Sequence, residues 1–157
     1  MDTPNIAFRP IKPADQGFLA GLYAETREDE MALSGWPQAQ IDTFLKFQFE
    51  AQHKYYLDQF PKASFDLVLL DGQPIGRLYL DRRHDELRII DIALLKAHQR
   101  KGMGGRMLRD ILDEAKASGK PVRIHVEHNN PALKLYQRLG FRKTGDSGVY
   151  YLMEWNP

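Results

Sequence analysis

The chain has 157 residues, of which 43% are hydrophobic and 27% charged, and it carries a formal net charge of +1 and no cysteine. Its length is typical of one domain, residues 1–157, with a sizeable core, and its nearly balanced charge argues against nucleic acid or a membrane surface as a partner. Without cysteine there are no disulfides, thiolate metal ligands or cysteine nucleophile, which is consistent with a reducing cytoplasm.

The first half of the chain alternates predicted strands and helices. Its first residues, "MDTPN", carry no targeting pattern, and no apolar run approaches the length of a membrane span. A strand is predicted over residues 5–11 and a helix over about 14–26, followed by an irregular connection, "REDEMALSGWPQ". A second helix is predicted over 41–60, because apolar residues recur at helical spacing at Phe44, Phe47, Ala51 and Tyr55. "SFDLVLL", the turn "DGQP" and "IGRLYLDRR" predict a β-hairpin.

The second half continues this mixed order. "ELRIIDIALLK" is a mostly apolar strand, as expected where both faces of a sheet are covered. A helix over 102–118 ends at Gly119 and Pro121. The last predicted elements are a strand in "VRIHVEHN", a helix in "PALKLYQRLG" and a strand in "VYYLMEW". Strands and helices mixed through one domain indicate an α+β or mixed α/β fold.

The segment "HQRKGMGGRML" lies between the apolar strand and the helix and combines three glycines with Arg100, Lys101 and Arg106. Backbone N–H groups point out of the start of a helix, where the helix dipole adds positive charge. Glycines leave space for a phosphate, although three of them reduce the stability of a helix start. The segment therefore predicts a pyrophosphate site in preference to a plain helix start.

Two other phosphate-binding loops match this segment less well. A Walker loop ends in Gly-Lys-Ser/Thr, which "GMGGRML" lacks. A Rossmann loop requires a third glycine where this chain has Met107. Because Glu127 could imitate the acid that binds the ribose, a Rossmann-variant nucleotide-binding protein stays open as the weaker alternative.

Two motifs resemble those of the GNAT superfamily of N-acetyltransferases. Gln99-x-x-Gly102-x-Gly104 is similar to the family signature Q/R-x-x-G-x-G/A, and "NNPALKLYQRLGF" resembles the downstream N-x-x-A-x-x-L-Y…G-F element. "FRPIKPAD" resembles the family's first strand and the entry to its first helix, and the order of elements follows the family over nearly all of the chain. The resemblance implies a mostly antiparallel mixed sheet of six to seven strands with splayed central strands, flanked by about four helices.

The resemblance also implies that acetyl-CoA binds as the acetyl-donor cosubstrate, without a metal. The glycine loop would bind the pyrophosphate, and backbone groups of Leu94 and Leu95 would bind the pantetheine arm, one N–H also polarising the thioester carbonyl. Asn129 would bind the arm from the other side, and helix capping by Asn129 or Asn130 is the alternative interpretation. The implied cosubstrate-binding residues are Leu94, Leu95, Gln99, Arg100, Lys101, Gly102, Met103, Gly104, Gly105, Asn129 and Tyr136.

The resemblance implies that Tyr136 is the general acid. A phenol with a pKa near ~10 is protonated at neutral pH and can protonate the departing thiolate; ordinary packing is the alternative interpretation. Many relatives have a basic glutamate where this chain has Arg88, so the general base stays open. Asp91, in an apolar strand that can raise its pKa, is the base we predict. The alternatives are Glu127, His125, a water-mediated base or an acceptor of low pKa.

The resemblance also implies that the acceptor, a small-molecule or peptide amine, lies against the segment joining the first two helices, "ETREDEMALSGW". Its acidic residues suit a cationic amine, although a solvated face is the favoured interpretation. The aromatic helix that follows indicates core packing or a homodimer contact. Together with the resemblance, the sequence predicts a cytoplasmic N-acetyltransferase in which the amine attacks the thioester directly in a ternary complex. A non-catalytic acetyl-CoA-binding module is the alternative.

Overall fold

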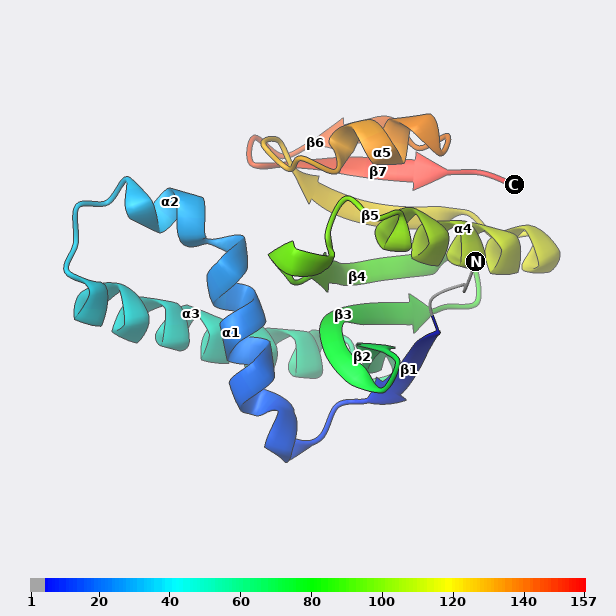
Figure 1. Ribbon diagram of the computed structural model, residues 1–157. Coiled ribbons are helices and arrows are strands. Elements are labelled where there is room, and N and C mark those ends of the chain that lie inside the picture. Colours follow the sequence, from blue (N-terminus) through cyan, green and yellow to red (C-terminus); the bar gives the residue numbers. More distant parts are fainter. Residues whose placement is uncertain (1–4) are drawn as a thin grey trace. The chain divides into compact units, whose positions relative to one another are not determined.

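Seven strands and five α-helices make up residues 5–157, the part of the chain that the computed structural model describes (Figure 1). Residues 1–4 lie outside the described residues. They include most of "MDTPN", the stretch in which no targeting pattern was found. No helix in the described part is long and apolar enough to cross a membrane. Across the same residues, no group of three or more His, Asp or Glu side chains is placed to hold a metal ion.

The elements in chain order are β1 (Ile6–Pro10), η1 (Pro13–Asp15), α1 (Gln16–Thr26), α2 (Glu28–Ala32), α3 (Gln38–Gln59), β2 (Ser64–Leu70), β3 (Gln73–Arg82), β4 (Leu87–Leu94), η2 (Lys96–His98), α4 (Met103–Ser118), β5 (Val122–Glu127), α5 (Leu133–Arg138), β6 (Arg142–Asp146) and β7 (Tyr150–Trp155).

The strands form one mixed sheet in the order β1-β2-β3-β4-β5-β7-β6. β4 and β5 are parallel, whereas β1–β2, β5–β7 and β6–β7 pair antiparallel. The pairing of β4 with β5 covers only three positions, Leu87↔Val122 to Ile89↔Ile124, although both strands continue beyond it. The two strands therefore separate in their second halves, which is the predicted splay. The predicted α+β fold with a mixed sheet is confirmed.

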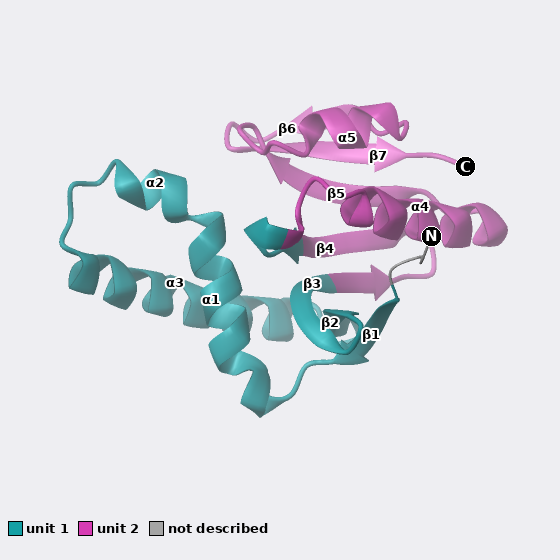
Figure 2. Ribbon diagram, in the orientation of Figure 1, with its two compact units in different colours: residues 1–78, 93–97 teal, residues 79–92, 98–157 magenta. Residues whose placement is uncertain are grey.

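The chain divides into two compact units (Figure 2). Unit 1 comprises the described part of Met1–Leu78 together with Ala93–Ala97, and unit 2 comprises Tyr79–Ile92 and His98–Pro157. The boundary crosses β4, so the last residues of this strand belong to unit 1. That the chain folds as a single domain stays a prediction.

The core of unit 1 lies where α1 crosses α3 (Figure 1). It is formed by Leu19, Tyr23, Ile41, Leu45, Phe49 and Leu67. The predicted apolar face of α3 is wrong in part, because Phe47 and Tyr55 are 72% and 57% exposed. Aromatic rings occur on both sides of this helix, and only the contact with α1 and β2 selects the face of Ile41, Leu45 and Phe49 for burial.

Two elements lie where no regular structure was predicted. α2 replaces part of the expected irregular connection, and its first turn is all acidic, Glu28, Asp29 and Glu30, which suits the positive end of a helix dipole. β6, "RKTGD", is an edge strand with mostly exposed residues and no apolar alternation. Charged edge strands are common because they discourage edge-to-edge association, and they leave little hydrophobic signal in a sequence.

Candidate active site

The glycine loop bends the chain sharply at the start of α4. Arg100 and Gly102 have positive φ values of 60° and 82°, a conformation that glycine adopts without strain. The first intrahelical hydrogen bond is donated by the Arg106 N–H to the Gly102 carbonyl at 3.0 Å. The N–H groups of residues 103–105 therefore have no acceptor within the helix, as at every helix start. This confirms the predicted turn from strand to helix.

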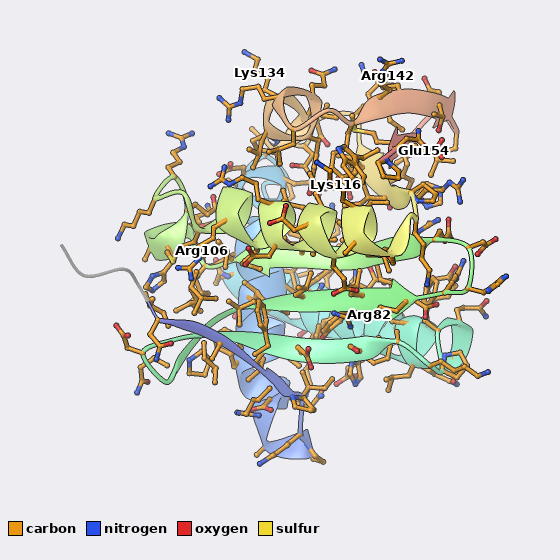
Figure 3. The ribbon with its side chains drawn as sticks, turned by 90° about the vertical axis from the view of Figure 1, so that its right-hand side faces the viewer. Arg82, Arg106, Lys116, Lys134, Arg142 and Glu154 are labelled. Atoms are coloured by element: carbon orange, nitrogen blue, oxygen red, sulfur yellow. The ribbon has the colours of Figure 1, made fainter. Side chains whose placement is uncertain are left out.

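The space outside the helix start is open at Gly104. A Cβ atom added there would meet no heavy atom within 4 Å, whereas one at Gly105 would lie 3.5 Å from Arg109 Nη1 and 3.8 Å from Leu135 Cδ1. Arg106 lies in the first turn of α4 and Lys116 near the opposite end (Figure 3). Gln99, Arg100 and Lys101 are exposed in the preceding loop. Open backbone beside positive charge is what an anionic ligand requires.

Leu94 and Leu95 lie in unit 1, directly against β3. The Leu95 N–H donates to the Ile75 carbonyl at 2.8 Å. A Cβ atom on Gly76 would collide with the Ala93 carbonyl oxygen and would lie 2.7 Å from Leu94 Cδ2. The Leu95 N–H thus already donates a hydrogen bond to β3, which argues against a hydrogen bond from this N–H to a pantetheine arm. The role of Leu94, and that of the Leu95 carbonyl, stays a prediction.

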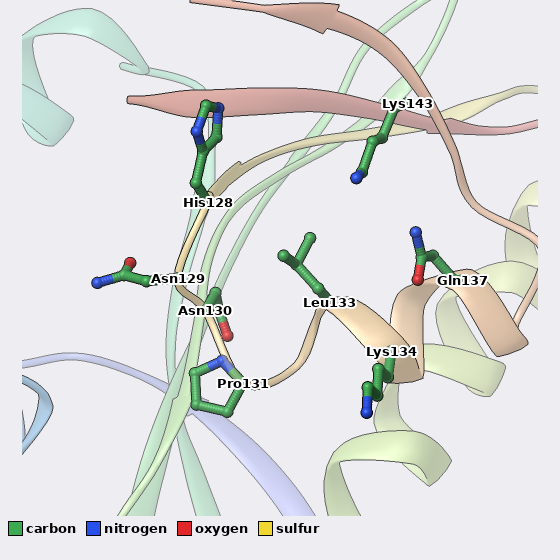
Figure 4. A pocket seen from close by; sticks show the side chains of 8 residues that line it. All are labelled: His128, Asn129, Asn130, Pro131, Leu133, Lys134, Gln137 and Lys143. Carbon is green, nitrogen blue, oxygen red and sulfur yellow. The ribbon is translucent and has the colours of Figure 1, made fainter. Parts of the chain in front are cut away.

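Asn129 is exposed in the connection between β5 and α5. Asn130 Oδ1 accepts the Ala132 N–H at 2.8 Å, so Asn130 makes the capping-type contact before α5. A surface pocket of about 510 Å³ adjoins both asparagines (Figure 4). It is lined by His128, Asn129, Asn130, Pro131, Leu133, Lys134, Gln137 and Lys143. Asn129 is therefore placed for contact with a ligand in this pocket or beyond it.

Tyr136 is buried in α5, with 3% of its surface exposed. Its ring lies edge-on to Phe141, with 5.6 Å between the ring centroids. Burial, and to a lesser extent the Asp91 carboxylate, raises the pKa of Tyr136 well above its ordinary value. The phenol is therefore protonated throughout the neutral range and can act as a proton donor. Both predicted catalytic residues belong to unit 2, where the charge of Asp91 acts on Tyr136.

Arg88, at the position of the usual base, contacts His125. Its guanidinium Nη2 donates to His125 Nδ1, since a guanidinium can only donate. Partial burial, and secondarily the charge of Arg88, lowers the pKa of His125. A neutral imidazole that accepts at Nδ1 carries its proton on Nε2 and has no lone pair left for a substrate. This geometry argues against His125 as the general base, which leaves Asp91, Glu127, a water-mediated base or an acceptor of low pKa.

The acidic segment "ETREDEMALSGW", which begins in the last turn of α1, is mostly solvated, as the favoured interpretation expects. The side chains of Glu28 and Asp29 are 63% and 101% exposed. The segment also binds Lys96: the Lys96 N–H donates to Glu25 Oε1 at 2.8 Å, and Lys96 Nζ lies 2.6 Å from Glu28 Oε2. Sequence reasoning missed this contact because its partners are up to 71 residues apart in the chain.

The profile of the Acetyltransferase (GNAT) family matches residues 21–141. A curated relative, the N-alpha-acetyltransferase RimI of Mycobacterium tuberculosis, is 33% identical over 66 residues, which cover 42% of this chain and 41% of RimI. This chain spans less than half the length of the curated relatives it matches.

Solved structures extend the similarity to almost the full chain. The PaiA N-acetyltransferase of Thermoplasma acidophilum, in complex with coenzyme A, superposes with a TM-score of 0.72 at 17% identity, over 98% of this chain and 99% of that one. A GNAT family acetyltransferase of Elizabethkingia anophelis with acetyl-CoA bound has a TM-score of 0.57 at 20% identity, over 98% and 99%. At these identities the likeness shows the fold.

Proposed function

The chain belongs to the Acetyltransferase (GNAT) family, and from this premise we propose that it transfers an acetyl group from acetyl-CoA to a primary amine. The observation that carries the proposal is the start of α4, where the family's glycine pattern leaves open backbone at Gly104 beside Arg106. That arrangement suits the pyrophosphate of acetyl-CoA. Solved proteins of the same fold hold coenzyme A or acetyl-CoA, which supports this choice of cosubstrate.

In this proposal the cosubstrate is held mainly by backbone groups. Residues 99–105 bind the pyrophosphate, with Arg100 and Lys101 as exposed cations. Leu94 contributes its backbone to the pantetheine arm, and Asn129 contributes its side-chain amide. Acetyl-CoA would supply an activated thioester, whose carbonyl carbon is attacked by the amine of the acceptor.

The proposed chemistry uses Asp91 and Tyr136 as a base and an acid. Asp91 takes a proton from the acceptor ammonium, and the free amine forms a C–N bond to the thioester carbonyl carbon. The C–S bond breaks as the tetrahedral intermediate collapses, and Tyr136 protonates the departing thiolate. The second proton that the attacking nitrogen loses as the amide forms restores the Tyr136 phenol. The effect of Asp91 on the pKa of Tyr136 supports a shared site. The chain contains no cysteine, so an acetyl-cysteine intermediate is excluded and direct attack in a ternary complex is the expected route.

A non-catalytic acetyl-CoA-binding module is the second candidate. Arg88 favours it, because an arginine that donates to His125 stands where many relatives have the base. Such a module would bind acetyl-CoA without consuming it. The two candidates therefore differ in turnover and not in cosubstrate binding.

An amine panel distinguishes these candidates and identifies the acceptor class. Release of coenzyme A would be followed with amino acids, polyamines, aminoglycosides and peptide N-termini as acceptors. Peptide N-termini belong in the panel because the chain resembles an N-alpha-acetyltransferase over 66 residues. Amine-dependent release above the rate without acceptor supports the enzyme. Acetyl-CoA binding without release by any amine supports the binding module, and no acetyl-CoA binding contradicts both.

A further inference from the structure

The end of β4 is held from two sides in unit 1. On one side, the Leu95 N–H donates to the Ile75 carbonyl, and Gly76 has no side chain that would keep the Ala93–Leu94 backbone away from β3. On the other side, the Lys96 N–H donates to Glu25 Oε1 at 2.8 Å. Residues 94 and 95 thus lie between two successive anchors of the main chain.

Lys96 contacts three carboxylates of the acidic segment: its backbone N–H bonds Glu25, and its Nζ pairs with Glu28 and, at 3.8 Å, with Asp29. The Lys96–Glu28 ion pair joins side chains that are 46% and 63% exposed, and exposed pairs contribute little and are screened by salt. The Glu25 contact is also on the surface, but there the carboxylate of a half-buried residue accepts the backbone N–H of Lys96. Such charge-assisted bonds are stronger than neutral ones, and this one acts on the main chain itself. Of the three carboxylates that contact Lys96, Glu25 therefore matters most for the main chain.

The position of Glu25 within α1 also indicates that its main interaction lies outside this helix. It lies in the last turn of the helix, which ends at Thr26. A carboxylate there opposes the helix dipole, because the carbonyl end of a helix carries partial negative charge. Glu25 therefore does not stabilise α1 through the dipole, and its interaction outside the helix is with the end of β4.

We propose that Glu25 is a positioning residue for acetyl-CoA: by holding the Lys96 N–H, it keeps the Leu94 backbone and the Leu95 carbonyl in the conformation that binds the pantetheine arm. This inference rests on the proposed function. Preorganised backbone binds more tightly, because less freedom is lost on binding. The first helix of the chain thereby influences cosubstrate affinity through one hydrogen bond.

Three substitutions test the role of Glu25. Glu25→Ala removes the acceptor of the Lys96 N–H, whereas Glu25→Gln keeps an oxygen at the same place without the charge. Glu30→Ala is the matched control, since it removes a nearby carboxylate that contacts Arg27 and not Lys96. Alanine also favours the helix and relieves the unfavourable charge at its end, so α1 itself is not weakened.

Calorimetry with acetyl-CoA is the first measurement. We expect Glu25→Ala to weaken binding about tenfold, as for the loss of one hydrogen bond to a charged group. Glu25→Gln should restore most of the affinity, and Glu30→Ala should bind like the wild type. In steady state, KM for acetyl-CoA should rise more than kcat falls. Hydrogen exchange should show faster exchange of the Lys96 amide in Glu25→Ala without any ligand.

Each outcome decides between the two proposals. Wild-type affinity in Glu25→Ala, or a lower Tm with unchanged affinity, overturns the positioning role while the acetyltransferase proposal stands. Failure of the wild-type protein to bind acetyl-CoA overturns the proposed function and this inference with it. Should Glu25→Ala not fold, Glu25→Asp serves instead: it keeps the charge but shortens the side chain by one methylene, and wild-type affinity in that variant overturns the role as well.

Discussion

At the scale of single residues, the mechanism depends most on Tyr136. Tyr136→Phe keeps the buried ring and its edge-on contact with Phe141 but removes the proton donor. We expect kcat to fall about a hundredfold with KM for acetyl-CoA nearly unchanged, as is typical for the loss of a general acid. Steady-state kinetics with an active acceptor measure both constants.

The control for this change is Tyr23→Phe, which alters a buried tyrosine of the α1–α3 core.

Burial raises the pKa of Tyr136, so its ionisation should not lower the wild-type rate at any pH below the ordinary tyrosine value of about 10. If Tyr136→Phe stays within about threefold of the wild-type rate while chemistry is rate-limiting, Tyr136 has no part in proton transfer.

At the scale of elements, the assignment of acetyl-CoA as the cosubstrate rests on the start of α4. Gly104→Glu places a carboxylate in space that is open in the structure, so the helix should fold, and an acidic residue in the first turn favours it. The same carboxylate would repel the pyrophosphate, and we expect acetyl-CoA binding to be lost. Calorimetry on the folded variant measures the affinity.

Gly104→Gln separates bulk from charge at this position. It adds a side chain of the same length without the negative charge, so it should weaken binding less than Gly104→Glu does. Equal, wild-type affinity in both folded variants would show that acetyl-CoA does not use this helix start.

The contact between Arg9 and Asp15, where β1 leads into η1 and α1, predicts that the stability of the fold depends on pH. Arg9 binds both carboxylate oxygens of Asp15 at 2.8 and 2.9 Å, and the Lys12 N–H donates to the same group at 2.7 Å. The Arg9 hydrogen bond, followed by that of Lys12, lowers the pKa of Asp15 to about 2. The stability gained from this group is therefore full above the unfolded pKa of about 4 and is lost as the pH falls toward 2.

Asp15→Asn should consequently lower the Tm at pH 7, and the difference from the wild type should close between about pH 4 and pH 2. Thermal unfolding followed by circular dichroism across this range tests it. Asp58→Asn, a change at an exposed position in α3, is the control. A Tm difference that is the same at pH 7 and pH 2 would exclude the Arg9–Asp15 contact as its cause.

At the scale of the whole molecule, the family assignment predicts a ranking of ligands. A ligand that binds only the folded state stabilises it by mass action, by about 2.7 kcal/mol at 100 times its Kd. For a chain of this length, acetyl-CoA at that concentration should raise the Tm by roughly 5–10 °C. NAD and ATP at equal concentration should raise it less. A larger shift with NAD or ATP would contradict the cosubstrate assignment and return support to a nucleotide-binding loop.

Features that depend on neighbouring residues could be predicted from the sequence. The glycine loop could be predicted because positive φ values and outward N–H groups belong to consecutive residues, as at Arg100 and Gly102. The hairpin of β2 and β3 and the end of α4 at Gly119 follow from local turn and capping chemistry in the same way. Family membership rested on two such local patterns in the correct order.

Contacts between groups that are distant in the sequence could not be predicted, because they depend on how separate segments pack. Arg88 reaches His125 because the parallel register places Arg88 beside Arg123, and side chains two residues apart share one face of a strand. The Glu25–Lys96 bond, the commitment of the Leu95 N–H to Ile75 and the buried face of α3 likewise depend on packing between separate segments. No local pattern encodes these contacts, because each partner alone is an ordinary residue whose role is set by the segment packed against it.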